Sequence, residues 1–458
     1  VSRVDELQKR YPTIPREVIV KWETSARGVS DAGITEKLGT WHRALGTYQS
    51  YDRGQSLKEL AQKHPGRVKP GFLLRPPHIF LTKSGQTARI GVDSTSPYVL
   101  KEDAPGKFAL YEGEEKVQDI FFPPSRPDVE EHLTSKGTPV AGLVSHLQPN
   151  NRNCFMIAPV RHCEYFSTGE ECKFCNYNST QEDARAIGLY RPVKANLEET
   201  VEAYKIVVSE SPKIVEGQIQ TGGFTNSDQE SKVYLQFVEQ IAGSTPYLPN
   251  ITLRTQPMSR SMMQRLKDAG TGAVSFNLEV WDPEIFAEVC PGKAKHRGRE
   301  RYLEAYQEAA EVFGWGSVGC DIVGGATMQA RNGHATWQEA RDSHIEGDDW
   351  LIRHGVLPVF LPIRLGAGSV YGNDKSSRAK LAPTEYYLEV ALAHHQTMLD
   401  TGMYERLNKL MYCPMDCIGP YSGELGMYAL AGSVGEWAKS AGIPDDGNWI
   451  ANFVSTLE

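Results

Sequence analysis

CFMIAPVRHCEYFSTGEECKFCN, residues 154–176, joins an apolar run to a loop that holds three of the chain's eight cysteines. The run CFMIAPV (154–160) predicts a buried strand. Cys163, Cys172 and Cys175 follow it with the spacing C-x8-C-x2-C. Three thiolates can hold an iron–sulfur cube through three of its irons and leave the fourth iron open to chemistry, whereas a site with four cysteines is closed.

A zinc site is the alternative for the same cysteines, because C-x2-C alone also occurs in zinc ribbons and thioredoxin-type motifs. Zinc would need a fourth ligand from His162, Asn176 or a distant cysteine. His162 adjoins Cys163, which is an awkward position for binding the same ion. From the cysteines alone, both kinds of site remain open.

The pattern of strand, loop and helix that begins at residue 154 repeats along the chain. Apolar runs that predict strands recur at 214–221, 250–256, 273–280, 318–325 and 356–363, with helical periodicity after them. Six such units predict a parallel sheet covered by helices. Because six units are too few for a closed eight-fold barrel, we expect an α/β fold with a partial (β/α)6 barrel over residues 151–372. In such barrels the chemistry lies at the carboxyl ends of the strands, where the cysteine loop falls.

Different patterns flank the predicted barrel. Residues 1–60 are expected to be helical and polar, and residues 71–125 contain short alternating runs, separated by Gly, Pro and Asp, that predict strands. We therefore expect an N-terminal α+β module over residues 1–150. Residues 373–458 are predicted to form a helical C-terminal extension, with a glycine-rich part that carries Cys413 and Cys417.

Composition and charge argue against several classes of protein. The 458 residues carry a formal net charge of −8 without a block of Lys and Arg, which disfavours a nucleic-acid partner. No run of eighteen apolar residues predicts a membrane helix, and the polar start VSRVDELQKRYPTIP is unlike a secretory signal peptide. Clustered cysteines without an export signal favour metal ligands over disulfides. The expected location is the cytoplasm.

The cysteine loop resembles that of the radical S-adenosylmethionine (SAM) superfamily, whose usual spacing is C-x3-C-x2-C; the loop here is five residues longer. The resemblance covers roughly residues 150–370. It implies a [4Fe-4S] cluster held by the three cysteines, with SAM bound at the open iron. It also implies that the reduced cluster cleaves SAM to methionine and a 5′-deoxyadenosyl radical, which abstracts hydrogen from a small-molecule substrate. An electron donor such as flavodoxin or ferredoxin would supply the electron.

The same resemblance implies which residues bind SAM. Thr221, Gly222 and Gly223 close a predicted strand like the family's Gly-Gly-Glu motif, with Phe224 in place of the acid. The sequence N-L-E at 277–279 is similar to the N-L-D or N-L-E of biotin synthase-like members. The other implied contacts are Asn277 and Glu279 with the ribose or amino group, Arg301 with the carboxylate, Phe174 beside the cluster and adenine, and Ile322 and Val323 beside adenine.

Further residues are candidates for contact with the substrate. Arg364 follows the last predicted strand, and Arg254 and Gln256 end the third, although such residues can also make hydrogen bonds to neighbouring loops. Cys413 and Cys417, in YCPMDC, are candidate catalytic thiols. The alternatives for these two are structural thiols or ligands of an auxiliary cluster, which would need further cysteines.

The sequence therefore predicts a radical SAM enzyme that converts a small metabolite by rearrangement, carbon–carbon or carbon–heteroatom chemistry. Two other classes remain open. One is a non-catalytic metal-binding or redox-sensing protein that uses the cysteines as a structural site. The other is an iron–sulfur electron carrier, which the missing fourth cysteine disfavours.

Overall fold

A seven-stranded sheet forms the centre of the protein in the computed structural model, which describes residues 1–43, 53–77, 79–82, 87–122, 131–147, 153–210, 214–244, 250–403 and 406. The strand order is β15-β14-β13-β12-β11-β10-β9. Strands β10 to β15 are parallel, and β9 is antiparallel to β10. The strands are β9 (Val144–Leu147), β10 (Asn153–Ile157), β11 (Ile214–Gln220), β12 (Asn250–Thr255), β13 (Thr271–Phe276), β14 (Val318–Gly324) and β15 (Val356–Pro362).

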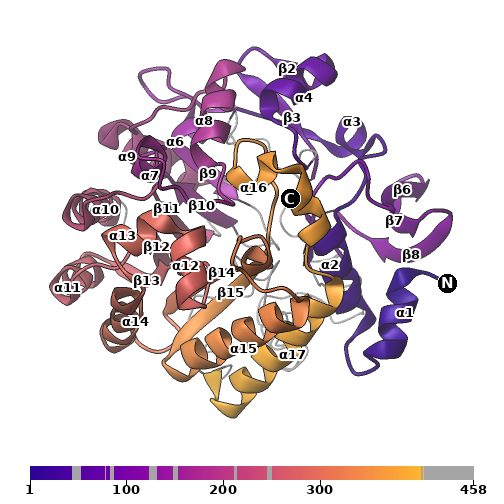
Figure 1. Ribbon diagram of the computed structural model, residues 1–458. Coiled ribbons are helices and arrows are strands. Elements are labelled where there is room, and N and C mark those ends of the chain that lie inside the picture. The colour runs from indigo at the N-terminus through magenta and orange to yellow at the C-terminus, as the bar shows by residue number, and fades with distance from the viewer. Residues whose placement is uncertain are drawn as a thin grey trace.

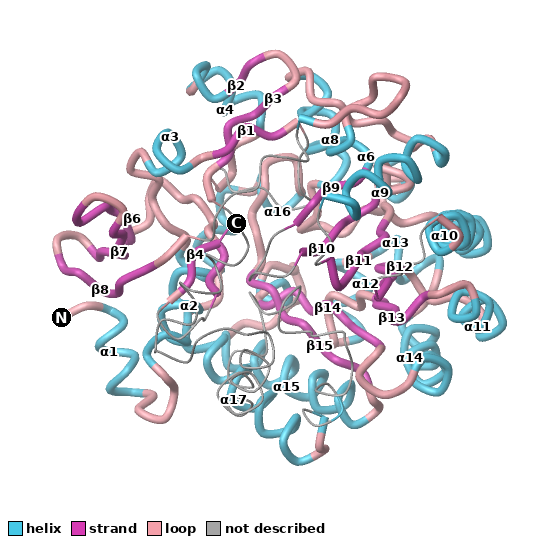
Figure 2. Tube along the Cα trace, turned by 180° about the vertical axis from the view of Figure 1, so that it is seen from behind, coloured by secondary structure: helices cyan, strands magenta, loops and turns pink. Residues whose placement is uncertain are grey.

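The six parallel strands confirm the predicted partial (β/α)6 barrel. Strands β9 and β15 are the two edges of the sheet, so the barrel is open. Helices lie outside the sheet (Figures 1 and 2). They are α9 (Leu197–Glu210), α10 (Ser227–Ala242), α11 (Arg260–Asp268), α12 (Pro283–Val289), α13 (Pro291–His296), α14 (Arg299–Phe313), α15 (Trp337–Arg353) and α17 (Thr384–Asp400).

Burial on both faces explains why the barrel strands have continuous apolar runs. Every residue of β14 is buried, as expected for a parallel strand that has helices on one face and the barrel interior on the other. The helices instead show one apolar face. In α14 the buried residues Tyr302, Ala305, Tyr306 and Ala309 recur every three or four positions.

Short connecting elements complete the barrel region. Two of them, α7 and α8, follow β10 and flank the last two cysteines of the loop. None of the described helices is long and apolar enough to cross a bilayer. The short elements are α6 (Val140–Leu143), α7 (Glu164–Ser167), α8 (Tyr177–Ala186), α16 (Val370–Asn373), η2 (Ala326–Met328) and η3 (Lys375–Lys380).

Helices and three small sheets make up the N-terminal part, as predicted. The sheets have the orders β1-β3-β2, β4-β5 and β6-β7-β8. The strands are β1 (Thr40–His42), β2 (Val68–Lys69), β3 (Phe72–Arg75), β4 (Ile79–Leu81), β5 (Thr87–Arg89), β6 (Tyr98–Ala104), β7 (Lys107–Glu112) and β8 (Glu115–Ile120). The helices are α1 (Arg3–Arg10), α2 (Arg16–Arg27), α3 (Ile34–Leu38), α4 (Leu57–Lys63) and η1 (Pro65–Arg67).

Helix α2 corrects the expectation that residues 1–60 are polar. It is buried along most of its length, including Lys21 and Glu23. The Trp22 ring stacks on Phe360 of β15, with ring centroids 4.8 Å apart, and on Tyr387 of α17, with centroids 5.5 Å apart. The N-terminal part is therefore packed against the last strand of the barrel. Its division from the barrel at residue 150 stays a prediction, although β9 lies before that residue and pairs within the barrel sheet.

The Trp22 contact gives a prediction for stability. Replacing Trp22 with alanine is expected to lower the free energy of unfolding by about 3–5 kcal/mol, because a fully buried indole between two rings is removed. Urea denaturation measures this change. Leu399→Ala is the control, since Leu399 is 47% exposed on α17 and its replacement is expected to change stability by about 0.5 kcal/mol or less. Equal effects of the two substitutions would contradict the described packing of α2.

Candidate active site

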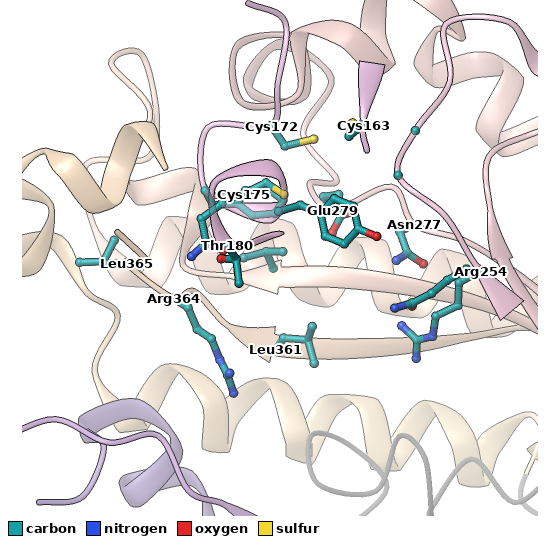
Figure 3. A pocket seen from close by; sticks show the side chains of 18 of the residues that line it. Cys163, Cys172, Cys175, Thr180, Arg254, Asn277, Glu279, Leu361, Arg364 and Leu365 are labelled. Atoms are coloured by element: carbon teal, nitrogen blue, oxygen red, sulfur yellow. The ribbon is translucent and has the colours of Figure 1, made fainter. Parts of the chain in front are cut away.

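A cavity of about 300 Å³ lies at the carboxyl ends of the parallel strands. The cysteine loop lines it, and strand-end residues of the barrel contribute the neighbouring walls (Figure 3). The N-terminal part completes it with residues from the end of α2 and from two later segments. These N-terminal lining residues are Ser25, Arg53, Gly54, Gln55, Arg89, Gly91 and Val92. The cavity is thus built from the barrel and the N-terminal part together.

All three cysteines of the loop line this cavity (Figure 3), and their role as metal ligands stays a prediction. The loop is held by its own backbone and by α8. The Cys175 amide donates to the Cys172 carbonyl at 2.8 Å, and the Cys163 amide donates to Oδ1 of Asn178 at 2.8 Å. Burial raises the pKa of the Cys163 thiol to about 11 and raises that of Cys175 further. Cys172 differs, because a hydrogen bond from Cys290 lowers its pKa.

The donor set fits an iron–sulfur cluster better than a single ion. Thiolates are the preferred ligands of such clusters. Zinc would draw its sulfur ligands to about 2.3 Å from one point. Among the described residues, no three His, Cys, Asp or Glu side chains are grouped closely enough to hold one metal ion. Three cysteines that line one cavity provide the thiolate donors that three irons of a cube would take.

Gly222 allows the end of β11 to approach the cysteine loop. A Cβ atom at this position would lie 2.2 Å from the His162 carbonyl oxygen and 2.6 Å from the Cys163 nitrogen. Hydrogen bonds hold the same junction, since the Glu164 amide donates to the Gly223 carbonyl at 2.9 Å. Thr221, Gly222 and Gly223 all line the cavity. The structure thus adds a packing role for the predicted T-G-G segment.

The N-L-E segment also reaches the cavity, through Asn277 and Glu279. Glu279 has φ 73° and is the only non-glycine residue with positive φ in the described part of the chain. Its side chain accepts a hydrogen bond from Nζ of Lys293 at 2.7 Å. The Lys293 ammonium also donates to the Asn277 carbonyl at 2.6 Å. Burial acts to lower the pKa of Lys293, but the adjacent Glu279 carboxylate raises it well above its usual value.

Asp321, on β14, organises the strand ends beneath the cavity, and sequence reasoning missed it. Its carboxylate accepts hydrogen bonds from Nη1 of Arg254 at 2.5 Å and from Nδ2 of Asn277 at 2.9 Å. The Asp321 side chain is 2% exposed, whereas that of Arg254 is 18% exposed and lines the cavity. One buried carboxylate therefore fixes both Arg254 and Asn277. The sequence shows that Asp321 carries a charge, but it does not show that these two residues are its partners.

Of the remaining predicted residues, some line the cavity, some lie elsewhere, and two fall outside the described part of the chain. Phe174, Val323 and Arg364 line the cavity, as does Gln256. Ile322 and Arg301 are not among the lining residues. Ile322 is buried beside Glu279 in a backbone bridge. The guanidinium of Arg301 donates to Glu308 at 2.7 Å and to the Met258 carbonyl at 2.6 Å, in a pocket separate from the cavity of the cysteines. Cys413 and Cys417 lie outside the described residues.

Sequence reasoning also missed a buried carboxylate at the end of the cavity near β12. Glu230, on α10, accepts hydrogen bonds from Nε2 of Gln256 at 2.6 Å and from the Thr255 hydroxyl at 2.8 Å. Tyr165 of the cysteine loop donates to Oε1 of the same Gln256 at 2.5 Å. Burial raises the pKa of Glu230. This network ties the cysteine loop to α10 and to the end of β12, and it orients Gln256 in the cavity wall.

Comparison with known proteins finds relatives of low similarity. The bacteriochlorophyllide c C-7(1)-hydroxylase of Chlorobaculum limnaeum is 26% identical over 192 residues, which are 40% of this chain and 47% of that protein. Among solved structures, the FeFe-hydrogenase maturase HydG of Carboxydothermus hydrogenoformans is 18% identical, with a TM-score of 0.39 over 55% of this chain and 53% of its own. The coproporphyrinogen III oxidase HemN of Escherichia coli, described as a radical SAM enzyme, is 13% identical, with a TM-score of 0.33 over 55% and 53% of the two chains.

The chain spans about half the length of these relatives, and no protein-family model matches it. An open barrel of six parallel strands with a three-cysteine loop at the strand ends is the arrangement of the radical SAM type. The chain resembles that superfamily in both respects. Its placement in the biotin synthase-like branch stays a prediction.

Proposed function

We propose that this protein is a radical SAM enzyme that acts on a small-molecule substrate. The observation that carries the proposal is the cavity in which Cys163, Cys172 and Cys175 lie together with the strand-end residues expected to bind SAM. A reduced [4Fe-4S] cluster in this place would supply one electron to SAM, which yields methionine and a 5′-deoxyadenosyl radical. That radical takes a hydrogen atom from the substrate and leaves as 5′-deoxyadenosine.

In this proposal the chain's own residues bind and orient the reactants. The three loop cysteines hold the cluster, and Phe174 packs beside it. Asn277 and the backbone of Gly222 and Gly223 face the ribose and amino group of SAM, because glycine lets the ligand approach the backbone closely. The Glu279–Lys293 pair presents opposite charges to the zwitterionic end of SAM, so the Arg301 contact is not needed for this arrangement.

The substrate is proposed to lie between the barrel and the N-terminal part. Arg364 (Figure 3) and the N-terminal lining residues form part of the walls that the cysteines do not occupy. The reaction proposed is a rearrangement or a carbon–carbon or carbon–heteroatom conversion, with flavodoxin or ferredoxin as electron donor and the cytoplasm as location. Cys413 and Cys417 are retained as proposed substrate-facing thiols.

A second candidate function is favoured by one contact. Backbone hydrogen bonds place the segment of Cys290 beside the cysteine loop, so a fourth cysteine lies near the three of the loop, and a closed cluster of a non-catalytic protein could use all four. The cavity argues for the open site, since it is lined by the three loop cysteines and not by Cys290.

Product analysis distinguishes these functions. The protein is reconstituted with iron and sulfide under anaerobic conditions, reduced with dithionite and incubated with SAM. We expect a [4Fe-4S] cluster and the formation of 5′-deoxyadenosine and methionine in equal amounts, measured by liquid chromatography and mass spectrometry. A reducible cluster that leaves SAM intact, or a protein that binds only zinc, would contradict the proposed enzyme.

A further inference from the structure

The walls of the cavity that holds the cysteines carry more positive than negative charge. Among the described residues that line it, five have cationic side chains and two have acidic ones. The cations are Arg53, Arg89, Arg254, Lys293 and Arg364, and the acids are Glu230 and Glu279. A cleft lined by an excess of one sign of charge attracts ligands of the opposite sign. The cavity is therefore suited to an anionic ligand.

Arg53 is the cation that the end of α2 holds at the cavity wall. Its guanidinium donates to the Ala26 carbonyl at 2.8 Å and to the Ser25 carbonyl at 3.1 Å. Both carbonyls belong to the last turn of α2, where backbone acceptors lack helical partners and favour a cation. The Asp93 carboxylate lies 3.8 Å from the same guanidinium, beyond hydrogen-bond distance. The charge of Arg53 is thus positioned mainly by neutral groups.

Backbone contacts fix the wall to which Arg53 belongs. The Arg53 amide donates to the Val92 carbonyl at 3.0 Å, and the Val29 amide donates to the Gly91 carbonyl at 2.8 Å. Gly28, with φ 75°, permits this approach, because a Cβ atom there would lie 2.7 Å from the Gly91 carbonyl oxygen. The N-terminal part therefore presents a connected surface to the cavity, built from segments that are separate in the sequence.

Arg364 carries the second charge, on the last strand of the barrel, and apolar residues accompany it. Leu361 and Leu365 are its neighbours in the sequence and line the same cavity (Figure 3). The stacking of Trp22 on Phe360 joins α2 to β15, so Arg53 and Arg364 are held by elements in direct contact. A ligand in this part of the cavity would meet positive charge together with apolar surface.

We propose that the substrate is a molecule with an apolar body and one or more carboxylate or phosphate groups, which Arg53 and Arg364 bind. The inference rests on the proposed function, because it names the substrate class of the same site. A guanidinium suits both anions, since its N–H groups match their oxygens in bidentate pairs. Few polar groups in a largely apolar pocket are the usual means of orienting a small ligand. The two arginines are binding residues that set specificity.

The test measures the affinity of three compounds that share a benzyl body. They are phenylacetate, benzyl phosphate and the neutral phenylacetamide. Each is titrated by anaerobic calorimetry into the reconstituted full-length protein, with SAM present and without reductant, so that SAM stays intact in its own site. We expect one or both anions to bind roughly 10- to 100-fold more tightly than the amide, as charge-assisted hydrogen bonds predict. The tighter of the two anions identifies the group as carboxylate or phosphate.

Arg53→Met and Arg364→Met test whether these two arginines bind the anion. Each is expected to weaken binding of the preferred anion roughly 10-fold or more and to leave binding of the amide unchanged. Arg53→Lys keeps a charge and is expected to lose less. Arg353→Met is the matched control, because Arg353 is 51% exposed on α15, is paired with Asp349 and does not line the cavity. If Arg53→Met does not fold, Arg364→Met and the preference of the wild type carry the test.

The outcomes separate the inference from the proposed function. Equal affinity for the three compounds, or no binding of any of them at millimolar concentration, would overturn the inference. A preference for anions that survives both methionine substitutions would overturn the role of these arginines. The enzyme proposal is judged by 5′-deoxyadenosine formation after dithionite is added to the wild type. Cleavage of SAM without a preference for anions refutes only the inference, whereas intact SAM beside a bound anion refutes the proposed function.

Discussion

Replacing Cys175 with alanine is expected to abolish both the cluster and SAM cleavage. Cys175 lies in the wall of the cavity between the loop and α8, and two remaining thiols cannot hold three irons of a cube. The effect is measured by three quantities: the iron content after reconstitution, the visible absorption of the cluster and the amount of 5′-deoxyadenosine formed. All three are expected to fall to the level of protein without iron.

The control for this substitution is Cys320→Ala, which removes a buried thiol away from the cavity and is expected to keep iron and activity. Circular dichroism of both variants checks that they fold. Continued cleavage of SAM by folded Cys175→Ala would show that the ligand assignment is wrong. Binding of zinc instead of iron by the wild type would favour the structural site.

Replacing Gly222 with alanine is expected to have the second largest effect. The new Cβ atom would meet the carbonyl of His162 and the nitrogen of Cys163, which are backbone atoms and can only move by displacing the first cysteine. Overpacking of this kind costs about 1–3 kcal/mol of stability. Loss of the groups that hold a metal ligand in place lowers metal affinity or activity by roughly 10- to 100-fold. We therefore expect a loss of that size in iron retention and in 5′-deoxyadenosine formation.

Gly66→Ala is the matched control for Gly222→Ala. No atom lies within 4 Å of a Cβ built on Gly66, and its φ is not in the left-handed region. We expect iron retention and activity as in the wild type. If both alanine variants keep their cluster equally well, the close approach of β11 to the cysteine loop is not required for the site.

The barrel was predictable from the sequence because each of its strands is buried on both faces. Strand β14 is a continuous buried run, and such runs alternate with helices that have one apolar face. The antiparallel strand β9 was not predicted, since four residues with one partner strand leave no distinctive pattern. Helix α2 was expected to be polar, but its Lys21 and Glu23 are buried with Trp22.

The sequence predicted those residues of the candidate site that lie at the carboxyl ends of the parallel strands. The cysteines, the T-G-G segment and Asn277 reach one cavity because parallel strands end at the same edge. Arg301 could not be placed by its motif, since Glu308 on the same helix holds its guanidinium in a pocket separate from that of the cysteines. The sequence around Cys290 contains no pattern that predicts its position near the cysteine loop. Its place beside the cysteine loop depends on backbone hydrogen bonds between two segments that are distant in the sequence.

The packing of Trp22 on Phe360 has a consequence for the order in which the protein matures. This contact joins the beginning of the chain to the last barrel strand, and contacts between segments far apart in sequence carry the largest entropic cost of closure. We therefore expect the barrel to form before the N-terminal part docks on it. Docking of α2 and Arg53 then encloses the cavity. If the proposed cluster is present, we expect iron and sulfide to enter before this last step of folding.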